Sequence, residues 1–342
     1  MNLKAYIQEN PFFLAPMAGV TVKPFRSFMR EMGCGVMTSE LVSARALKEK
    51  NSKTLPLIEF EEHHKPYGIQ IFGESADIIA EGAKRAEDFG VDFIDLNLGC
   101  PVNKIVKKGA GSALLKDLKV LKKVLSALKS SVNIPVSLKI RTGWDHQTRN
   151  SDQVAQIALE EGFEWMSLHG RTRSQAYSGK ADWNYIKQIN SQTALRIVGN
   201  GDLMTGEQAC SALKWSSCFA VMIGRACLND PWIFLSAREH LEKGLKKKSR
   251  KSVLSKDYNQ AMTCLKKHLE NFYEERLFLL HLKKFAVWFS SGFPHSTEFR
   301  RKVFRERHKA FVIEIIEDFF NKNQSFKKTL PVYEPFLMQG HG

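Results

Sequence analysis

The stretch 93–101 reads FIDLNLGCP, an apolar strand-like run that ends abruptly at a glycine, a cysteine and a proline. Pro101 has no backbone N–H and keeps the residue before it extended, so the strand cannot continue there as a helix. Gly99 lets the backbone turn or approach a flat ligand closely. A thiol at such a strand end, Cys100, is therefore expected to face a pocket.

Seven other apolar runs share this character and recur at intervals of 23–43 residues. Amphipathic helical patterns such as 75–90 and 117–131 lie between them. Apolar strands that alternate with helices indicate parallel strands buried on both faces. Eight such units in about 230 residues favour a closed (β/α)8 TIM barrel over an open sheet, with the active site at the carboxyl ends of the strands. The eight runs are 12–19, 35–41, 67–73, 93–101, 136–143, 165–172, 196–202 and 220–226.

The barrel pattern stops near residue 241, and the rest of the chain differs in composition. We predict a barrel domain over 1–242, a basic linker over 243–256, a small all-helical domain over 257–324 and an irregular tail over 325–342. Residues 241–342 carry +10 of the net charge of +15. Clustered Lys and Arg attract phosphates, so a polyanionic partner is one interpretation and a solvated basic surface is the other.

Composition limits the class of protein further. The hydrophobic content of 43% and the charged content of 25% are ordinary for a globular chain. We see no apolar run near the roughly 20 residues that span a bilayer, and no secretory signal at the N-terminus. The six cysteines show no CxxC or CxH spacing, which favours reduced thiols in the cytoplasm over a disulfide framework or a zinc site.

Two glycine-containing loops at the end of the barrel pattern point to a phosphate site. Gly199-Asn200-Gly201-Asp202 ends the seventh run, and Gly224-Arg225 ends the eighth. Barrels often bind phosphate with these two loops, through backbone N–H groups and a cation. Glycine turns that merely cap the strands are the alternative, but their occurrence on adjacent strands favours phosphate.

Three further side chains carry a titratable group within or at the end of an apolar run. Lys139 is flanked by apolar residues, and a buried ammonium needs a partner, which is either an anionic ligand or a structural carboxylate such as Asp95 or Glu40. His169 ends the sixth run beside two arginines, either as an anion or flavin contact or as an ordinary hydrogen-bonded histidine. Cys100 is either an acid, which a reference thiol pKa near 8.5 allows, or a small buried hydrophobe.

Taken together, the motifs resemble those of the tRNA-dihydrouridine synthases, flavoenzymes that reduce a uridine of tRNA. The resemblance covers roughly residues 10–235, and residues 169–173 and 177–183 are similar to the bacterial B-type branch. The motifs are, in order, APMAG (15–19), QIFG (70–73), NLGCP (97–101), KIR (139–141), HGRTR (169–173), GNGD (199–202) and GR (224–225).

The resemblance implies a role for each matching residue. Cys100 would protonate uracil C5 while reduced FMN delivers hydride to C6, with NADPH as the reductant and NADH as the alternative. Asn97, Arg171 and Arg173 would contact the substrate. The residues that would hold FMN are Pro16, Met17, Ala18, Gln70, Lys139, His169, Asn200, Gly201, Asp202, Gly224 and Arg225. No metal is expected.

The helical remainder is similar in character to the tRNA-binding domain of the family. One departure is Phe285, which stands where relatives commonly have a histidine after an Arg-Lys pair, and it leaves the target uridine open. We expect a cytoplasmic monomer that binds tRNA and no membrane. Two alternatives remain, which are an FMN-dependent dehydrogenase of a free pyrimidine (dihydroorotate- or dihydropyrimidine-type) and a noncatalytic tRNA-binding protein.

Overall fold

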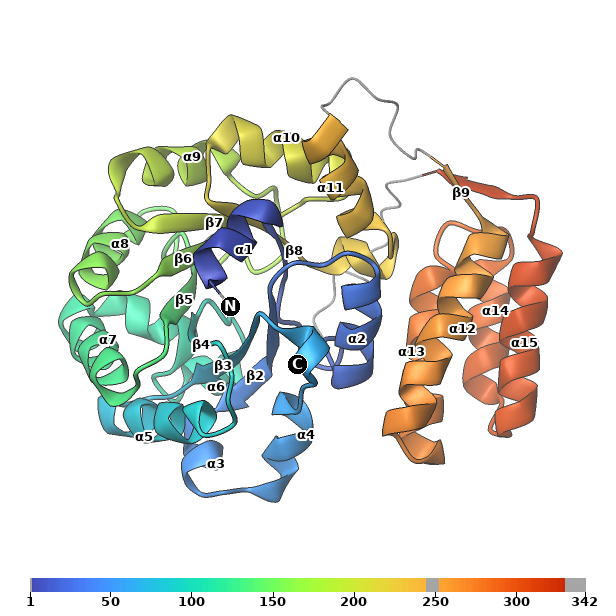
Figure 1. The fold of residues 1–342 in the computed structure, drawn as a ribbon, viewed down its shortest axis with the longest axis horizontal. Helices are drawn as coiled ribbons and strands as arrows, with labels where there is room; N and C mark the ends of the chain where they lie inside the picture. The colour runs from blue at the N-terminus through green and yellow to red at the C-terminus, as the bar shows by residue number, and fades with distance from the viewer. Residues whose placement is uncertain (1, 244–251, 330–342) are drawn as a thin grey trace.

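The computed structural model describes residues 2–243 and 252–329, and within them a ring of eight parallel strands is surrounded by helices (Figure 1). Each of the eight apolar runs contains one strand, so the predicted TIM barrel with a C-terminal helical domain is confirmed. The strands are β1 (Phe12–Leu14), β2 (Met37–Ser43), β3 (Tyr67–Phe72), β4 (Phe93–Leu98), β5 (Val136–Arg141), β6 (Trp165–His169), β7 (Arg196–Asn200) and β8 (Ala220–Ile223).

The strands pair in the order β1-β8-β7-β6-β5-β4-β3-β2, and backbone bonds bring the two ends of this sheet together. Leu14 N donates to Val36 O at 2.9 Å, and Gly35 N donates to Phe12 O at 3.0 Å. All six residues of β4 are buried, because the barrel core covers one face and the outer helices cover the other. The ring therefore gathers all eight carboxyl strand ends at one mouth.

The outer helices begin where the sequence supplies N-caps. Ser75 Oγ accepts from Ile78 N at the start of α5, and Asp117 accepts from Lys119 N and Val120 N at the start of α7. The α-helices of the barrel domain are α1 (Leu3–Glu9), α2 (Lys23–Glu31), α3 (Ala44–Lys48), α4 (Leu55–Ile58), α5 (Ala76–Glu87), α6 (Asn103–Val106), α7 (Leu118–Ser131), α8 (Ser151–Glu160), α9 (Trp183–Gln192), α10 (Gly206–Ser216) and α11 (Ile233–Lys243).

Short 3-10 helices complete the barrel domain at η1 (Ser52–Thr54), η2 (Glu62–His64), η3 (Gly111–Lys116) and η4 (Arg225–Leu228). The last of these follows β8 directly, so Arg225 begins a helical turn at the barrel mouth.

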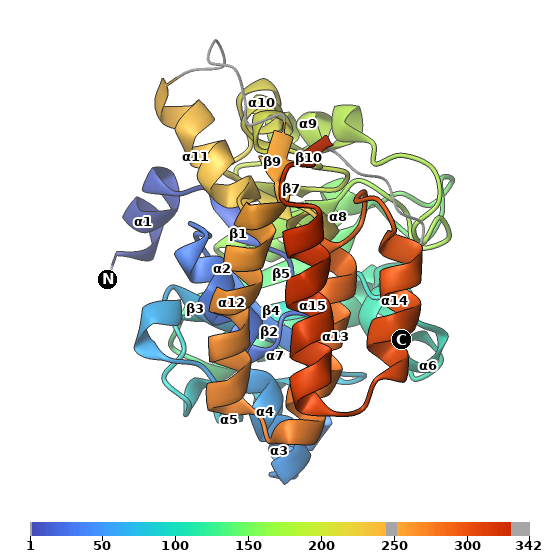
Figure 2. The same cartoon turned by 90° about the vertical axis from the view of Figure 1, so that its right-hand side faces the viewer.

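The C-terminal domain is a bundle of four helices that stands beside the barrel (Figures 1 and 2). Its elements are β9 (Ser252–Leu254), α12 (Ser255–Phe272), α13 (Glu275–Phe289), α14 (Ser296–Arg305), α15 (Lys309–Lys322) and β10 (Lys327–Thr329).

Two aromatic residues of the apolar pattern in this domain, Phe304 and Phe311, are 54% exposed, whereas Val312 and Ile316 are buried. The reason is a break between α14 and α15, where the Glu306 side chain accepts from the backbone N–H groups of Arg307 and His308.

Helix α2 carries the contact between the two domains. Phe25 of α2 stacks on Phe285 of α13, with ring centroids 4.8 Å apart and planes 14° apart. The rings of Phe28 and Phe289 also meet at this interface, with centroids 6.1 Å apart and planes tilted by 42°. Phe285 is fully buried, so the residue that departs from the pattern of the relatives serves the interface between the domains.

The start of the predicted tail is ordered as β10, which pairs antiparallel with β9. The ammonium of Lys328 is buried, donates to Asn229 O and Phe289 O at 3.1 and 3.2 Å, and lies 4.6 Å from the ring centroid of Tyr258. Asn229 belongs to the barrel domain, so this strand fastens the bundle to it. The rest of the predicted linker and tail, 244–251 and 330–342, lies outside the described residues.

Within residues 2–243 and 252–329, no helix combines the length and the apolar character needed to cross a membrane. Each of the six cysteines is a free thiol.

Candidate active site

The residues singled out in the sequence converge on the barrel mouth from the carboxyl ends of the strands. Gln70 lies in β3 and Asn97 near the end of β4, with Cys100 two residues beyond that strand. Lys139 lies in β5, opposite Asn97 in the strand register, and His169 lies opposite Asn200 where β6 and β7 end. Parallel strands place these side chains at one edge because their carboxyl ends coincide.

A chain of buried hydrogen bonds fixes the turn that carries Cys100. Ser137 Oγ donates to Asp95 at 2.6 Å, and the other oxygen of Asp95 accepts from Gln70 Nε2 at 2.7 Å. Asn97 Nδ2 donates to Gln70 Oε1 at 2.9 Å. Each side chain in this network is hydrogen-bonded to the next, and a connected network of this kind makes the site that it supports more rigid.

The Asn97 side chain connects this hydrogen-bond network to the backbone of Cys100. Its Oδ1 accepts from Gly99 N at 3.2 Å and from Cys100 N at 3.0 Å, which forms an Asx turn. Ser112 Oγ donates to Cys100 O at 2.9 Å from the other side. The backbone of Cys100 is therefore held at both its N–H and its carbonyl, and the residue is half-buried.

Burial raises the pKa of the Cys100 thiol, and this effect exceeds the opposing influence of the Val102 backbone N–H and of the cations Arg141 and Lys139. The thiol is therefore protonated at neutral pH. A protonated thiol in a pocket is chemically suited to donate a proton rather than to attack as a nucleophile.

The ammonium of Lys139 donates to Asn200 Oδ1 at 3.3 Å. Asp95 is hydrogen-bonded to Gln70 and Ser137 and acts on Lys139 through its charge without a direct hydrogen bond, while Glu40 accepts from Gly19 N. Burial, followed by the like charge of Arg141, lowers the pKa of Lys139 to about 8. Lys139 thus remains a cation at neutral pH in a setting that favours an added anion.

Four cations surround His169, and the histidine itself is neutral. Burial lowers the pKa of His169 well below its usual range, and the charges of Arg141, Lys139, Arg171 and Arg225 act in the same direction. The neutral ring accepts a long contact of 3.5 Å from Arg171. The cluster therefore presents positive potential at the ends of β5, β6 and β8.

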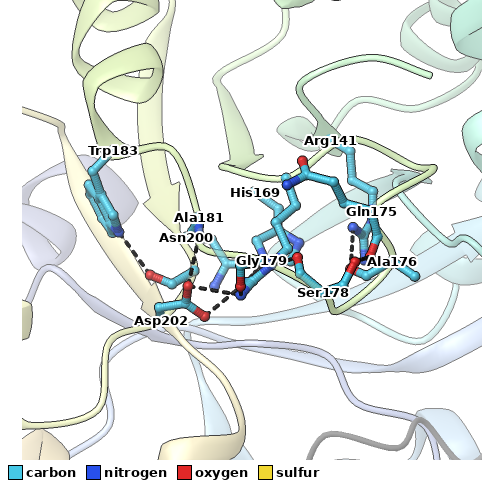
Figure 3. Close-up of polar contacts among 12 residues, drawn as sticks. Arg141, His169, Gln175, Ala176, Ser178, Gly179, Ala181, Trp183, Asn200 and Asp202 are labelled. Atoms are coloured by element: carbon cyan, nitrogen blue, oxygen red, sulfur yellow. Dashed lines mark hydrogen bonds and ion pairs between the residues drawn. The ribbon is translucent and has the colours of Figure 1, made fainter. Parts of the chain in front are cut away.

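The buried Arg171 pairs with the partly exposed Asp202, and this pair braces the loops after β6 and β7. The guanidinium of Arg171 donates to both carboxylate oxygens of Asp202 at 2.8 and 2.9 Å and also to the carbonyls of Ser178 and Gly179. Asp202 further accepts from Ala181 N at 2.7 Å (Figure 3). Arg171 is 1% exposed, so its charge is used inside the protein, which differs from the substrate contact expected of it.

The loops after β1, β7 and β8 approach other segments closely at two glycines, Gly201 and Gly224. Trp183 Nε1 donates to Gly201 O at 2.8 Å (Figure 3), and a Cβ on Gly201 would lie 2.5 Å from that of Ala181. A Cβ on Gly224 would lie 3.9 Å from Met17 Sδ. Met17 and Pro16 are half-buried and Ala18 is exposed, which leaves this segment as one wall of the mouth.

Comparison with known proteins agrees with this geometry. The family model described as dihydrouridine synthase matches residues 13–324. The chain belongs to the dihydrouridine synthase family.

Similar relatives include a probable tRNA-dihydrouridine synthase of Rickettsia prowazekii, at 34% identity over 90% of this chain and 93% of the relative. The tRNA-dihydrouridine synthase B of Pseudomonas aeruginosa is 32% identical over 95% and 97%, and that of Vibrio parahaemolyticus is 33% identical over 94% and 99%. The resemblance to the bacterial B-type branch is thereby confirmed.

Among solved structures, histamine dehydrogenase from Rhizobium sp. 4-9 is similar in fold alone. Its TM-score is 0.50 at 14% identity, over 78% of this chain and 51% of that one.

Arg173 lies on the rim of this dihydrouridine synthase barrel. Its guanidinium donates to Asn103 Oδ1 at 2.8 Å and lies 4.4 Å from the ring centroid of Trp144. Lys116 lies over the same ring at 3.6 Å. The half-buried Arg173 therefore connects the loop after β6 to the helix that follows Cys100, and the rim presents an aromatic ring between two cations.

The sequence analysis assigned no separate role to Arg141, although it quoted the residue within the KIR motif. Arg141 Nε donates to Gly99 O at 2.9 Å, and its Nη1 donates to Thr172 O and Ala176 O. It thus holds the backbone directly before Cys100. The alternation of strand side chains could have revealed it, since residues 139 and 141 share one face of β5.

Proposed function

We propose that this protein reduces a specific uridine of tRNA to 5,6-dihydrouridine, with FMN as the bound cofactor and NADPH as the reductant. The observation that carries the proposal is the half-buried Cys100, whose backbone is held by Asn97 at a mouth rich in cations, in a chain of this family. The net charge of +10 on residues 241–342 supports tRNA as the substrate, because phosphates attract clustered cations. The enzyme would act in the cytoplasm as a monomer.

The chemistry of the mouth fits FMN. Lys139 and Arg225 supply charge for a phosphate and for an anionic ring edge, and neutral His169 adds a hydrogen-bonding ring beside them. Asn200 and Gly201 lie at the end of β7, and Gly224, after β8, lies close to Met17, which follows the neighbouring strand β1. Asp202 would act indirectly, through its bonds to Arg171 and Ala181.

The remaining contacts would involve the flat face and the edge of the ligand rings. Pro16, Met17 and Ala18 would line one side of the ring. Gln70 and Asn97 each have an amide NH₂ that donates one hydrogen inside the network, and the second hydrogen is suited to the ring edge of a ligand.

FMN, when bound and reduced by NADPH, supplies hydride to uracil C6. Cys100 would deliver the thiol proton to C5 from the other face of the base, and Lys139 would stabilise negative charge on the cofactor side. Arg173, on the rim, would contact the substrate RNA. The uridine must leave its stack to reach the mouth, so base flipping is part of the proposal.

The test is mass spectrometry of unmodified tRNA after incubation with the protein, FMN and NADPH. A gain of two hydrogens at one uridine position, absent when NADPH or FMN is withheld, is the expected result. Parallel assays with free uridine, dihydroorotate and dihydropyrimidines examine the small-molecule alternative. Turnover of those compounds without reduction of tRNA would overturn the proposal, as would a folded protein that binds tRNA but takes up no flavin.

A further inference from the structure

A groove of about 560 Å³, lined by residues of α12 and by Glu31 of α2, lies at the boundary of the two domains, away from the barrel mouth. One wall is the end of α2, which carries Glu31, and the other wall is α12. Figure 2 shows α12 running alongside α2 at this boundary. The groove therefore belongs to neither domain alone, and no step of the proposed reaction uses it.

Three potential metal ligands converge in this groove. Cys264 and His268 are four residues apart on α12, so both face α2. Cys264 Sγ lies 2.9 Å from Glu31 Oε2, and His268 Nε2 lies 2.7 Å from Glu31 Oε1. The three ligand atoms all lie within 4.8 Å of one another.

We propose that Glu31, Cys264 and His268 form a Zn²⁺ site that clamps the helical domain to the barrel, with water as the fourth ligand. A thiolate, an imidazole and a carboxylate are the three donor types that zinc takes in proteins. The thiolate argues against Mg²⁺ and Ca²⁺, which prefer oxygen ligands. The open groove gives the ion and the water a path to the ligands.

The existing contacts are those of a metal-free site. The thiol of Cys264 donates to one oxygen of Glu31, and the ring of His268 bonds to the other. Zinc binding would replace both hydrogen bonds: the thiol proton is released to solvent, Sγ and Nε2 bind the ion, and one carboxylate oxygen joins them. Ligand atoms of a tetrahedral zinc site lie roughly 3.5 Å apart, so small side-chain movements suffice.

The sequence analysis missed this site because its search covered CxxC and CxH spacings. Here the helical spacing of 264 and 268 supplies two ligands, and the third comes from residue 31. Because the site joins α2 to α12 beside the Phe25–Phe285 stack, bound zinc would fix the bundle against the barrel.

The experiment measures zinc on the full chain after chelator treatment and dialysis. We expect about one Zn²⁺ per chain by elemental analysis, and with Co²⁺ a thiolate charge-transfer absorption band. Cys264→Ser and His268→Gln are expected to weaken zinc binding by about 100-fold or more, since loss of outer partners alone costs 10–100-fold. Zinc should also raise the unfolding midpoint of the wild type but of neither variant.

Matched controls remove the same side-chain types elsewhere. Cys100→Ser and His308→Gln are expected to bind zinc as the wild type does and to retain the Co²⁺ band. The unfolding midpoints of the metal-free variants report whether they fold. The proposal is overturned if the wild type binds no stoichiometric zinc, or if folded Cys264→Ser binds zinc with unchanged affinity.

Discussion

The barrel mouth and the helical bundle both carry positive charge, but they hold it differently. At the mouth, Lys139 and Arg141 are at least partly buried, converge on one point and are fixed by bonds to Asn200 and Gly99. On the bundle, Arg301, Arg305 and Arg307 are exposed. Buried convergent cations bind a small anion in one geometry, whereas exposed cations attract an extended polyanion through the release of counterions. Under the proposed function, the two regions would separate binding of the cofactor from binding of the nucleic acid.

The largest effect expected at the mouth follows Cys100→Ala. Without the proton donor, we expect the rate of dihydrouridine formation to fall by about 10²–10⁴-fold, because positioned general acids contribute that much. Flavin content should be unchanged, since Cys100 holds no phosphate. Single-turnover kinetics measures the rate, and Cys210→Ala, a buried cysteine on the outer helix α10, is the control. An unchanged rate would remove Cys100 from the mechanism.

The next largest effect concerns Asp202→Asn at the rear of the mouth. Asn tolerates the positive φ of +53° at this position, but it leaves the buried Arg171 without its carboxylate. Arg171 is buried but the Asp202 side chain is partly open to solvent, so the free energy of unfolding should fall by about 1.5–3 kcal/mol in chemical denaturation, the range for a hydrogen bond to a charged group.

Glu160→Gln is the matched control for that change. It breaks an exposed pair with Lys122 and should leave stability unchanged. A loss below about 1 kcal/mol for Asp202→Asn would mean that the carbonyls of Ser178 and Gly179 alone suffice for Arg171.

Cofactor affinity should depend on pH through Lys139. Its lowered pKa of about 8 means that the charge is present below pH 8 and is lost as the pH rises above it. FMN binding to the apoprotein should therefore weaken above pH 8, by up to about tenfold per pH unit. Fluorescence quenching of FMN across pH 6.5–9.5 measures this, and Lys139→Arg should abolish the alkaline decline. A flat profile for the wild type would exclude a binding role for the Lys139 charge.

The smallest effect is expected on the bundle. The double variant Arg301→Gln/Arg305→Gln should reduce the slope of log affinity for tRNA against log salt by roughly 1–2, at about 0.7–0.9 per phosphate contact. Affinity for FMN should respond much less to salt in either protein. Equal salt slopes for tRNA in variant and wild type would place the RNA contact elsewhere on the molecule.

The sequence predicts the barrel because its signals are local. Apolar runs on both faces of each strand specify β1–β8, and Gly99 with Pro101 marks the turn at Cys100. Strand ends then bring Gln70, Lys139 and His169 to one place, since a closed parallel barrel has a single carboxyl edge.

What the sequence hides depends on specific side-chain contacts, two of which join residues far apart in the chain. The sequence motif led us to expect that Arg171 contacts RNA, whereas Arg171 is paired with Asp202, 31 positions away. The burial of Phe285 against Phe25 depends on the docking of two domains, and α14 ends at Arg305 through a side-chain bond of Glu306. Helical periodicity carries no information on any of these three contacts.

The strand β10 has a consequence for the order in which the protein folds during synthesis. The barrel has all eight strands once Ile223 is made, whereas the bundle lacks the partner of β9 until Thr329 follows. Domains fold as units from the N-terminus. A ribosome that stalls within α15 would therefore display a finished barrel and a bundle that lacks one of its ties to the barrel, because Lys328 has not yet reached Asn229 and Phe289.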